Sequence, residues 1–227
     1  MRNTVLFEDN HLLIVNKPAG ILVQGDKTGD ETLSDDCKQY IKKKYKKPGE
    51  VFLGVIHRLD RPVSGAIIFA RTSKGLERMN ALFRDREIQK TYWALTKHKP
   101  PATEGELIHY LKKKVTNDKV KVTASFKGGK GGQKAVLTYK MIGRISEYYL
   151  LEVKPETGRP HQISVQLAKM GCPIHGDLKY GGDKSADRSA IYLHSRSVQF
   201  VHPVKKESVR VDAKIPKDQI WQLFQGI

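Results

Sequence analysis

The run His57-Arg58-Leu59-Asp60-Arg61 contains the residue types in this chain most suited to chemistry, because it sets one carboxylate between two arginines. Nearby positive charge favours the ionised form of a carboxylate, and an ionised carboxylate can act as a nucleophile or a base. Taken alone, the run favours a loop aspartate that caps a backbone turn, since short motifs often match by chance. Asp60 is therefore a candidate reactive group that needs support from the rest of the chain.

Further blocks accompany this run along the chain. They are Val15-Asn16-Lys17-Pro18-Ala19-Gly20, Lys90-Thr91-Tyr92-Trp93-Ala94, Thr157-Gly158-Arg159-Pro160-His161-Gln162-Ile163, Gly171-Cys172-Pro173-Ile174-His175-Gly176-Asp177 with Tyr180-Gly181, and Leu193-His194-Ser195-Arg196 through His202-Pro203. Together they resemble the RluA-type RNA pseudouridine synthases, in which His-Arg-Leu-Asp followed by Ser-Gly holds the catalytic aspartate. The resemblance extends from about the N-terminus to Pro216, and agreement over such a length rarely arises by chance.

The resemblance implies an isomerase that converts a specific uridine in structured RNA, ribosomal or transfer, to pseudouridine without a cofactor or metal. Breaking the C1′–N1 bond puts positive character on the sugar, which an adjacent anion can stabilise or attack. By carry-over, Asp60 is the catalytic carboxylate, and Tyr92 packs on the uracil and is a candidate for removing the C5 proton. The residues leave open whether Asp60 attacks the sugar, attacks the base or removes a sugar proton.

The resemblance also implies residues that contact RNA. They are Lys17, Arg58, Arg61, Arg159, His161 and Gln162. Arg58 is expected to fill the space that the flipped-out base leaves in its stack. Arg58 and Tyr92 also have ordinary explanations, as a surface arginine that pairs with a local acid and as an aromatic residue on a half-buried strand. For Tyr92 alone, the ordinary explanation is the stronger.

One position departs from the family pattern. The family usually carries an arginine that pairs with the catalytic aspartate two residues after Gln162, where this chain has Ser164. A serine cannot replace a cation, so Arg159 or Arg61 is expected to substitute. The chain is predicted to be active, and a catalytically degenerate RNA-binding relative is the alternative. A glycoside hydrolase ranks last, because no second acid stands out beside Asp60.

The charge of the chain narrows the choice of partner. Lysine and arginine number 41 against 24 acidic residues, so the net charge is 41 − 24 = +17. Such an excess attracts polyanions, although charge alone does not separate RNA from DNA or anionic lipid. Two lysine runs, Lys112–Lys114 and Lys119–Lys121, suggest a basic hairpin, and such runs usually face water. Gly128–Gly132 is predicted to be a flexible connector, with a phosphate-cradling loop as the alternative.

Cysteine and histidine usage argues against a disulfide framework or a metal site. Only Cys37 and Cys172 are present, without paired metal-ribbon or redox spacing, which indicates a reduced compartment. The histidines near the motifs form no compact ligand pattern; they are His57, His161, His175, His194 and His202. No run approaches the ~18 apolar residues of a membrane span. The residues Met1–Thr4 are not followed by the apolar core of a signal peptide. We expect a cytoplasmic monomer without membrane partners.

Mostly strands must position these residues. Runs typical of strands cover residues 5–8, 12–16, 66–70, 92–96, 120–126, 135–141, 148–153, 197–201 and 208–213. A helix is predicted after Thr32, which has capping-box spacing with Asp35, to near Tyr45. A second is predicted from Ser73 to about Asp85, with an apolar stripe of Leu76, Met79 and Phe83. A third is predicted from Pro160 to Gly171, which ends it as a left-handed cap. This content predicts an α+β architecture. The resemblance adds one catalytic domain over residues 1–227, a bent, mixed or mainly antiparallel sheet, a basic cleft, and no separate N-terminal RNA-binding module.

Overall fold

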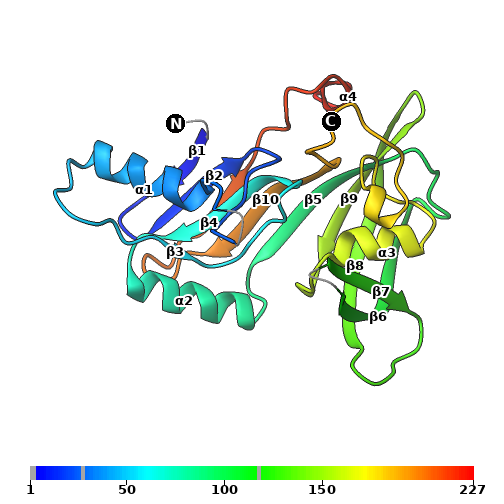
Figure 1. Ribbon diagram of the computed structural model, residues 1–227, viewed down its shortest axis with the longest axis horizontal. Coiled ribbons are helices and arrows are strands. Elements are labelled where there is room, and N and C mark those ends of the chain that lie inside the picture. The colour runs from blue at the N-terminus through cyan, green and yellow to red at the C-terminus, as the bar shows by residue number, and fades with distance from the viewer. Residues whose placement is uncertain (1–3, 27–28, 117–118) are drawn as a thin grey trace. The chain divides into compact units, whose positions relative to one another are not determined.

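The structure, a computed structural model, describes residues 4–26, 29–116 and 119–227. The first three residues, on which part of the N-terminal prediction rests, lie outside the described residues. The chain divides into two units (Figure 1), which are described separately here. Unit 1 comprises Met1–Lys90 and Ser195–Pro216, and unit 2 comprises Thr91–His194 and Lys217–Ile227. The prediction of a single domain over residues 1–227 stays a prediction.

Unit 1 is built on strands whose neighbours come from distant parts of the sequence. They are β1 (Thr4–Glu8), β2 (Leu12–Lys17), β3 (Gly54–Val55), β4 (Ser64–Ala70), β10 (Leu193–Val201), which begins in unit 2, and β11 (Ser208–Asp212). Their order is β1-β2-β4-β10, with β11 beside β10 and β3 beside β4. Every residue of β4 is buried, as expected of a central strand with an unbroken apolar run. The antiparallel register of β2 and β4 pairs Lys17 with Gly65, next to the candidate catalytic loop.

Two helices lie in the described part of unit 1, and both agree with prediction to within one residue. Helix α1 (Leu33–Lys44) begins with the predicted capping box, in which Thr32 and Asp35 bond reciprocally. Helix α2 (Ser73–Arg84) begins where the Thr72 hydroxyl accepts a hydrogen bond from the backbone N–H of Gly75. Met79 of α2 is fully buried in a core cluster with the apolar residues of β2 and β4. Helix α2 therefore covers one face of the unit 1 sheet.

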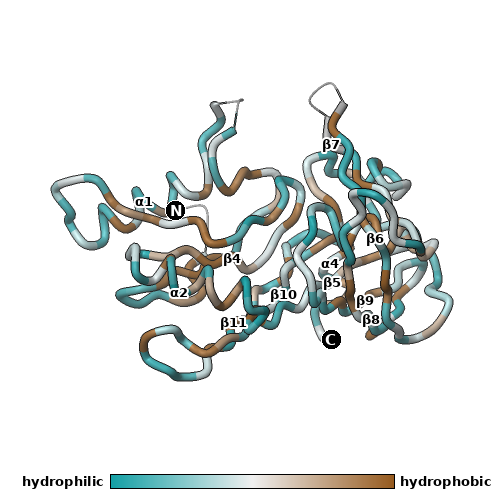
Figure 2. The backbone as a smooth tube through the Cα atoms, turned by 90° about the horizontal axis from the view of Figure 1, so that it is seen from below, coloured by the Kyte–Doolittle hydropathy of each residue, from teal (hydrophilic) through white to brown (hydrophobic). Residues whose placement is uncertain are grey.

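Unit 2 contains a second antiparallel arrangement. Its elements are β5 (Gln89–Thr96), β6 (Glu104–Thr116), β7 (Lys119–Ser125), β8 (Gln133–Ile145), β9 (Tyr148–Pro155), α3 (Gln162–Lys169), the 3₁₀ turn η1 (Leu178–Tyr180) and α4 (Gln219–Gln222). The strand order is β5-β9-β8-β6-β7. Hydrophobic stretches follow the strands of each unit in Figure 2. Helix α3 packs on one face through a cluster of Leu111, Val122, Ala135 and Val165.

The predicted α+β class is confirmed, and two details differ from prediction. Helix α3 begins at Gln162 rather than Pro160, because the preceding His161 has a left-handed backbone with φ 52°. Its end was correctly predicted, since Gly171 is left-handed with φ 91°. The predicted basic hairpin is confirmed by the antiparallel pairing of β6 with β7, but β6 (Glu104–Thr116) begins well before Lys112, in residues that were not predicted as a strand. Its three consecutive lysines hide the alternation of apolar and polar positions on which strand prediction depends.

Candidate active site

The loop that carries Asp60 connects β3 to β4 and alternates between buried and exposed side chains. Leu59 and Val63 are buried, whereas Arg58 and Asp60 are exposed. The backbone N–H of Val63 donates to the carbonyl of Asp60 at 3.0 Å and closes a turn. The two apolar side chains thus anchor the loop in the core, and the arginine and the carboxylate are presented to solvent.

Lys17 lies beneath this turn and is fully buried. Its ammonium donates to the carbonyls of Pro18 at 3.0 Å, Arg61 at 3.0 Å and Val63 at 2.6 Å. Burial lowers the pKa of Lys17 to about 7, and the charge of Asp60 acts in the opposite direction. Three N–H groups therefore meet three carbonyl oxygens, two of them in the Asp60 turn. This burial is at odds with the predicted RNA contact and fits a residue that positions the turn.

His57 holds the start of the same loop. Strand β3 pairs with β4 only as far as Val55, opposite Phe69. The next available N–H on β4, that of Ile68, donates to Nε2 of His57 at 3.0 Å, so a side chain replaces the main-chain partner. The imidazole also stacks on Phe83 with ring centroids 4.8 Å apart. Burial, helped by Lys90, lowers the pKa of His57 to about 3, which keeps Nε2 free to accept this bond.

Arg61 is occupied within unit 1. Its Nη1 lies 2.9 Å from a carboxylate oxygen of Asp30, and its Nε donates to the carbonyl of Gly20 at 3.0 Å. The backbone N–H of Gly20 returns a bond to the carbonyl of Arg61 at 2.8 Å. These contacts tie the turn to the segment after β2. The ion pair with Asp30 is half-exposed, so it does not commit the guanidinium, and the substitution of Arg61 for the missing arginine stays a prediction.

Gly65, in the Ser-Gly pair of the motif, is required by packing. Its φ is 114°, in the region that favours glycine. A Cβ atom at this position would lie within 3 Å of the backbone of Ser195 in β10. The motif glycine therefore permits the close approach of two strands immediately after the Asp60 turn.

The remaining predicted site residues belong to unit 2. Tyr92 is half-buried on β5, opposite Val153 of β9. Gln162 is buried, and its Oε1 accepts bonds from the Thr157 hydroxyl at 2.8 Å and the Arg159 N–H at 3.0 Å. Its Nε2 donates to the carbonyl of Val136 at 3.0 Å. Because its amide is used to hold the segment before α3, Gln162 fits a structural role better than the predicted RNA contact.

Arg159 and His161 stay closer to the surface than Gln162. The Nε of Arg159 donates to the carbonyl of Lys134 at 3.3 Å, and the imidazole of His161 meets the edge of Tyr180 with centroids 5.7 Å apart. The N–H of Gln162 donates to the carbonyl of Arg159, so this helix start is partly occupied by its own backbone. The convergence of these residues and Tyr92 with Asp60 stays a prediction.

Ser164, at the position where an arginine is usual, has a local partner. It is buried, and its hydroxyl hydrogen-bonds to the carboxylate of Asp177. Burial raises the pKa of Asp177, while the Ser164 hydroxyl and the nearby His161 oppose that rise. Position 164 is therefore fitted to a small donor, and within unit 1 Lys17 lies close enough to Asp60 for the carboxylate to oppose the lowering of the Lys17 pKa by burial.

Two roles were missed by sequence reasoning. Lys17 is the cation beside Asp60, although it stands in the Asn-Lys-Pro block that signalled a site. His57 is an anchor of the loop, although it opens the His-Arg-Leu-Asp run. Within the described ranges, no three or more His, Cys, Asp or Glu side chains group so as to hold a metal ion. No helix in the described part of the chain is long and apolar enough to span a membrane.

Comparison with known proteins identifies the family of this chain. The family described as RNA pseudouridylate synthase matches residues 11–169. An uncharacterised RNA pseudouridine synthase of Bacillus subtilis, YhcT, is 35% identical over 94% of this chain and 69% of its own length. The tRNA pseudouridine synthase C of Vibrio vulnificus is 31% identical over 97% of this chain and 94% of its own.

A further relative and a solved structure extend the comparison. The ribosomal large subunit pseudouridine synthase D of Zymomonas mobilis is 30% identical over 94% of this chain and 69% of its own length. The solved structure of human RNA Pseudouridylate Synthase Domain Containing 4 has a TM-score of 0.79 and 25% identity, and the match covers 97% of this chain and 92% of that one. The chain therefore belongs to the RNA pseudouridylate synthase family, is of the RluA type, and is an RNA pseudouridine synthase.

Proposed function

We propose that this enzyme isomerises a specific uridine of ribosomal or transfer RNA, acting as a monomer through one catalytic domain with Asp60 as the catalytic carboxylate. The observation that carries the proposal is the exposed Asp60 on a turn held by the buried ammonium of Lys17. The substrate class is supported by the names of relatives that act on large-subunit ribosomal RNA and on tRNA.

The proposed chemistry uses the exposed and the buried parts of the loop differently. Asp60 faces the ribose of a flipped uridine. It either stabilises the positive charge that develops on the sugar when the C1′–N1 bond breaks, or attacks C1′ directly. Lys17 keeps the turn rigid, which reduces the reorganisation needed at the moment of reaction. Arg58, exposed beside Asp60, fills the space left in the RNA stack, and Tyr92 packs on the uracil. The uracil then rotates and bonds to C1′ through C5, C5 loses its proton to solvent, and N1, freed from C1′, takes up a proton.

The test is release of tritium from unmodified ribosomal and transfer RNA labelled at uridine C5. We expect release by the wild-type enzyme and none by Asp60→Asn, with near-normal RNA affinity, because phosphate contacts dominate binding. The matched control is Asp85→Asn, which removes an exposed carboxylate from the end of α2 and should leave turnover unchanged. Full activity of Asp60→Asn would refute the assigned role.

The second candidate, a degenerate RNA-binding relative, is favoured by Ser164 alone. It predicts salt-sensitive binding of both RNAs without tritium release. A Ser164→Arg variant separates the two possibilities, with Ser164→Gln as a control of similar bulk without charge. A gain of orders of magnitude in turnover with Arg but not Gln would support degeneracy. We expect no gain, because an arginine there would enter a site where Ser164 now bonds Asp177.

A further inference from the structure

The segment from Leu107 to Lys134 carries most of its charge in one sign. It contains eight lysines and a single acid, Asp118, so its net charge is 8 − 1 = +7. The segment forms most of β6, all of β7 and the start of β8. The sequence alone favoured lysines that simply face water. The strand register shows on which face of the sheet each of these lysines lies.

Opposed residues in antiparallel strands share a face, and neighbours along a strand alternate between faces. Leu111 opposes Ala124, and Lys113 opposes Val122, on the face covered by α3. The opposite face holds Tyr110, Lys112, Lys114, Lys121 and Lys134, which we call the lysine face. All four of these lysines are exposed. Lysine and valine positions alternate along the first four residues of β7.

One pair on the lysine face works against folding. Lys114 lies directly opposite Lys121 across β6 and β7. Like charges in this arrangement destabilise a sheet. Within the described ranges, no carboxylate lies within 4.0 Å of any lysine of this face. The hydrophobic cluster under α3 already holds the three strands together, so this pair has no evident part in stability.

The glycine-rich loop after β7 lies against the same face. A Cβ atom on Gly128 would be 3.1 Å from the Tyr110 ring, and one on Gly132 would be 3.4 Å from the Tyr110 Cβ. The N–H of Gly132 donates to the carbonyl of Gly129 at 2.9 Å and closes a turn. The missing side chains let the loop approach Tyr110 closely, and exposed Lys127 and Lys130 add positive charge there.

We propose that the lysine face binds the phosphate backbone of the substrate RNA. The inference rests on the proposed function for the identity of the polyanion. Lysines at alternate positions of one strand repeat every ~7 Å along an exposed surface, which suits a run of phosphates better than a single small anion. Bound phosphates would also relieve the repulsion between Lys114 and Lys121.

The test compares two variants with equal loss of charge. Lys114→Gln/Lys121→Gln removes the opposed pair, and Lys113→Gln/Lys169→Gln removes two exposed lysines on the α3 side. Affinity for a fluorescent, unmodified tRNA transcript and an unmodified ribosomal RNA transcript is measured between about 50 and 200 mM salt. For the lysine-face variant we expect the salt slope to fall by about 1 to 2 and affinity to fall about tenfold. The control should keep the wild-type slope within about 0.5.

Equal effects of the two variants would overturn the proposal, since they would reflect total charge. Loss of binding to anionic phospholipid vesicles without loss of RNA binding would also overturn it, in favour of a membrane partner. Tritium release measured in parallel keeps the two proposals apart. The lysine-face variant should raise KM and leave kcat unchanged. If the wild-type enzyme released no tritium, the proposed function would fail while the binding comparison still decided the role of this face.

Discussion

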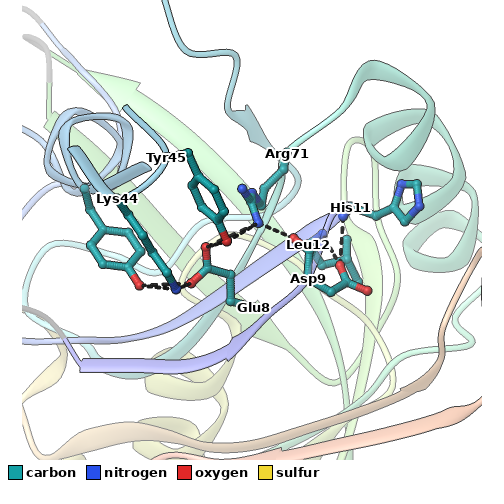
Figure 3. Close-up of polar contacts among 8 residues, drawn as sticks. Glu8, Asp9, His11, Leu12, Lys44, Tyr45 and Arg71 are labelled. Atoms are coloured by element: carbon teal, nitrogen blue, oxygen red, sulfur yellow. Dashed lines mark hydrogen bonds and ion pairs between the residues drawn. The ribbon is translucent and has the colours of Figure 1, made fainter. Parts of the chain in front are cut away.

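Two groups of basic side chains in this protein have opposite surroundings. In unit 1, the Glu8 cluster, formed by Glu8, Tyr40, Lys44, Tyr45 and Arg71, gathers its charges around one carboxylate (Figure 3). The side chain of Glu8 is 8% exposed and lies 2.6 Å from Lys44 and 3.2 Å from Arg71. Burial raises the pKa of Glu8, but bonds from Lys44 and both tyrosines outweigh it and hold this pKa below its usual value.

The lysine face of unit 2 is the reverse case. Its four lysines are exposed, and one of them opposes another lysine across the sheet. The cations of the Glu8 cluster link α1 and the segment after β4 to β1, so their charge serves the fold. The comparison teaches that the cations behind the net charge of +17 serve different purposes in different parts of the molecule. Whether a carboxylate stands beside a cation decides if that cation remains available to a polyanion.

The largest effect is expected for Lys17→Met, which removes the most enclosed cation. Three carbonyls would lose their donor, so we expect a loss of about 3 kcal/mol in the free energy of unfolding and at least ~10-fold in turnover. Urea unfolding and tritium release measure the two effects. Lys43→Met, an exposed lysine near the end of α1, is the control and should change stability by only a few tenths of a kcal/mol. Similar results for both variants would break the distinction between enclosed and exposed cations.

A somewhat smaller loss is expected for Glu8→Gln. The substitution keeps the shape of the side chain but leaves Arg71, whose side chain is 9% exposed, without its carboxylate. We expect a loss of about 2 to 3 kcal/mol in unfolding free energy, with tRNA affinity unchanged. Glu77→Gln, on the surface of α2, is the matched control. A drop in RNA affinity without a drop in stability would show that the Glu8 cluster contributes to RNA binding rather than to the fold.

His57 gives a prediction about pH, because it is a basic group kept uncharged. Its pKa in the folded protein, about 3, is below that of the unfolded chain, so the unfolded state alone gains a proton as pH falls from about 6.5 towards 3. Stability should therefore fall on acidification, by about 2 kcal/mol at pH 5. His57→Gln, which can still accept the Ile68 N–H, should lack this part of the pH dependence. If the denaturant midpoints of the two proteins changed equally between pH 7 and about pH 5, His57 would not be the source of this pH dependence.

The smallest expected effect is a gain in stability rather than a loss. Lys114→Thr removes the like-charge pair with Lys121 and adds a residue suited to strands, so unfolding free energy should rise by about 0.5 kcal/mol. Lys113→Thr, which opposes Val122, lacks the repulsive partner and is the control. A thermal unfolding series at low and high salt would sharpen the result, because the gain should shrink as salt screens the pair. A stability loss would show that Lys114 supports the sheet.

Much of the fold was predictable because it follows local rules. The capping box at Thr32, the apolar stripe containing Met79 and the left-handed Gly171 are set by neighbours in sequence, and all three were confirmed. The buried run in β4 also predicted a strand. The start of α3 was wrong by two residues, because His161 has a left-handed backbone, which the proline at position 160 did not predict.

The site was predictable in position but less so in the roles of its members. Asp60 stands on an exposed turn, as a reactive group would need to. Lys17 and Gln162 were expected to contact RNA, yet their polar atoms bond to backbone groups inside their own units. The type of a residue in a motif block indicates that a polar side chain is required at that position of the site. Which group it satisfies depends on chain segments 44 to 46 residues away in the case of Lys17.

Gly65 has a consequence for recognising inactive relatives of this enzyme. Its missing side chain is demanded by the backbone of Ser195, which has no part in the proposed reaction. A descendant that lost its catalytic carboxylate would still be held to this glycine by its architecture. Architecture therefore also accounts for Gly65, His57 and Leu59 of the signature, and only the exposed Arg58 and Asp60 can report on whether selection for turnover has continued.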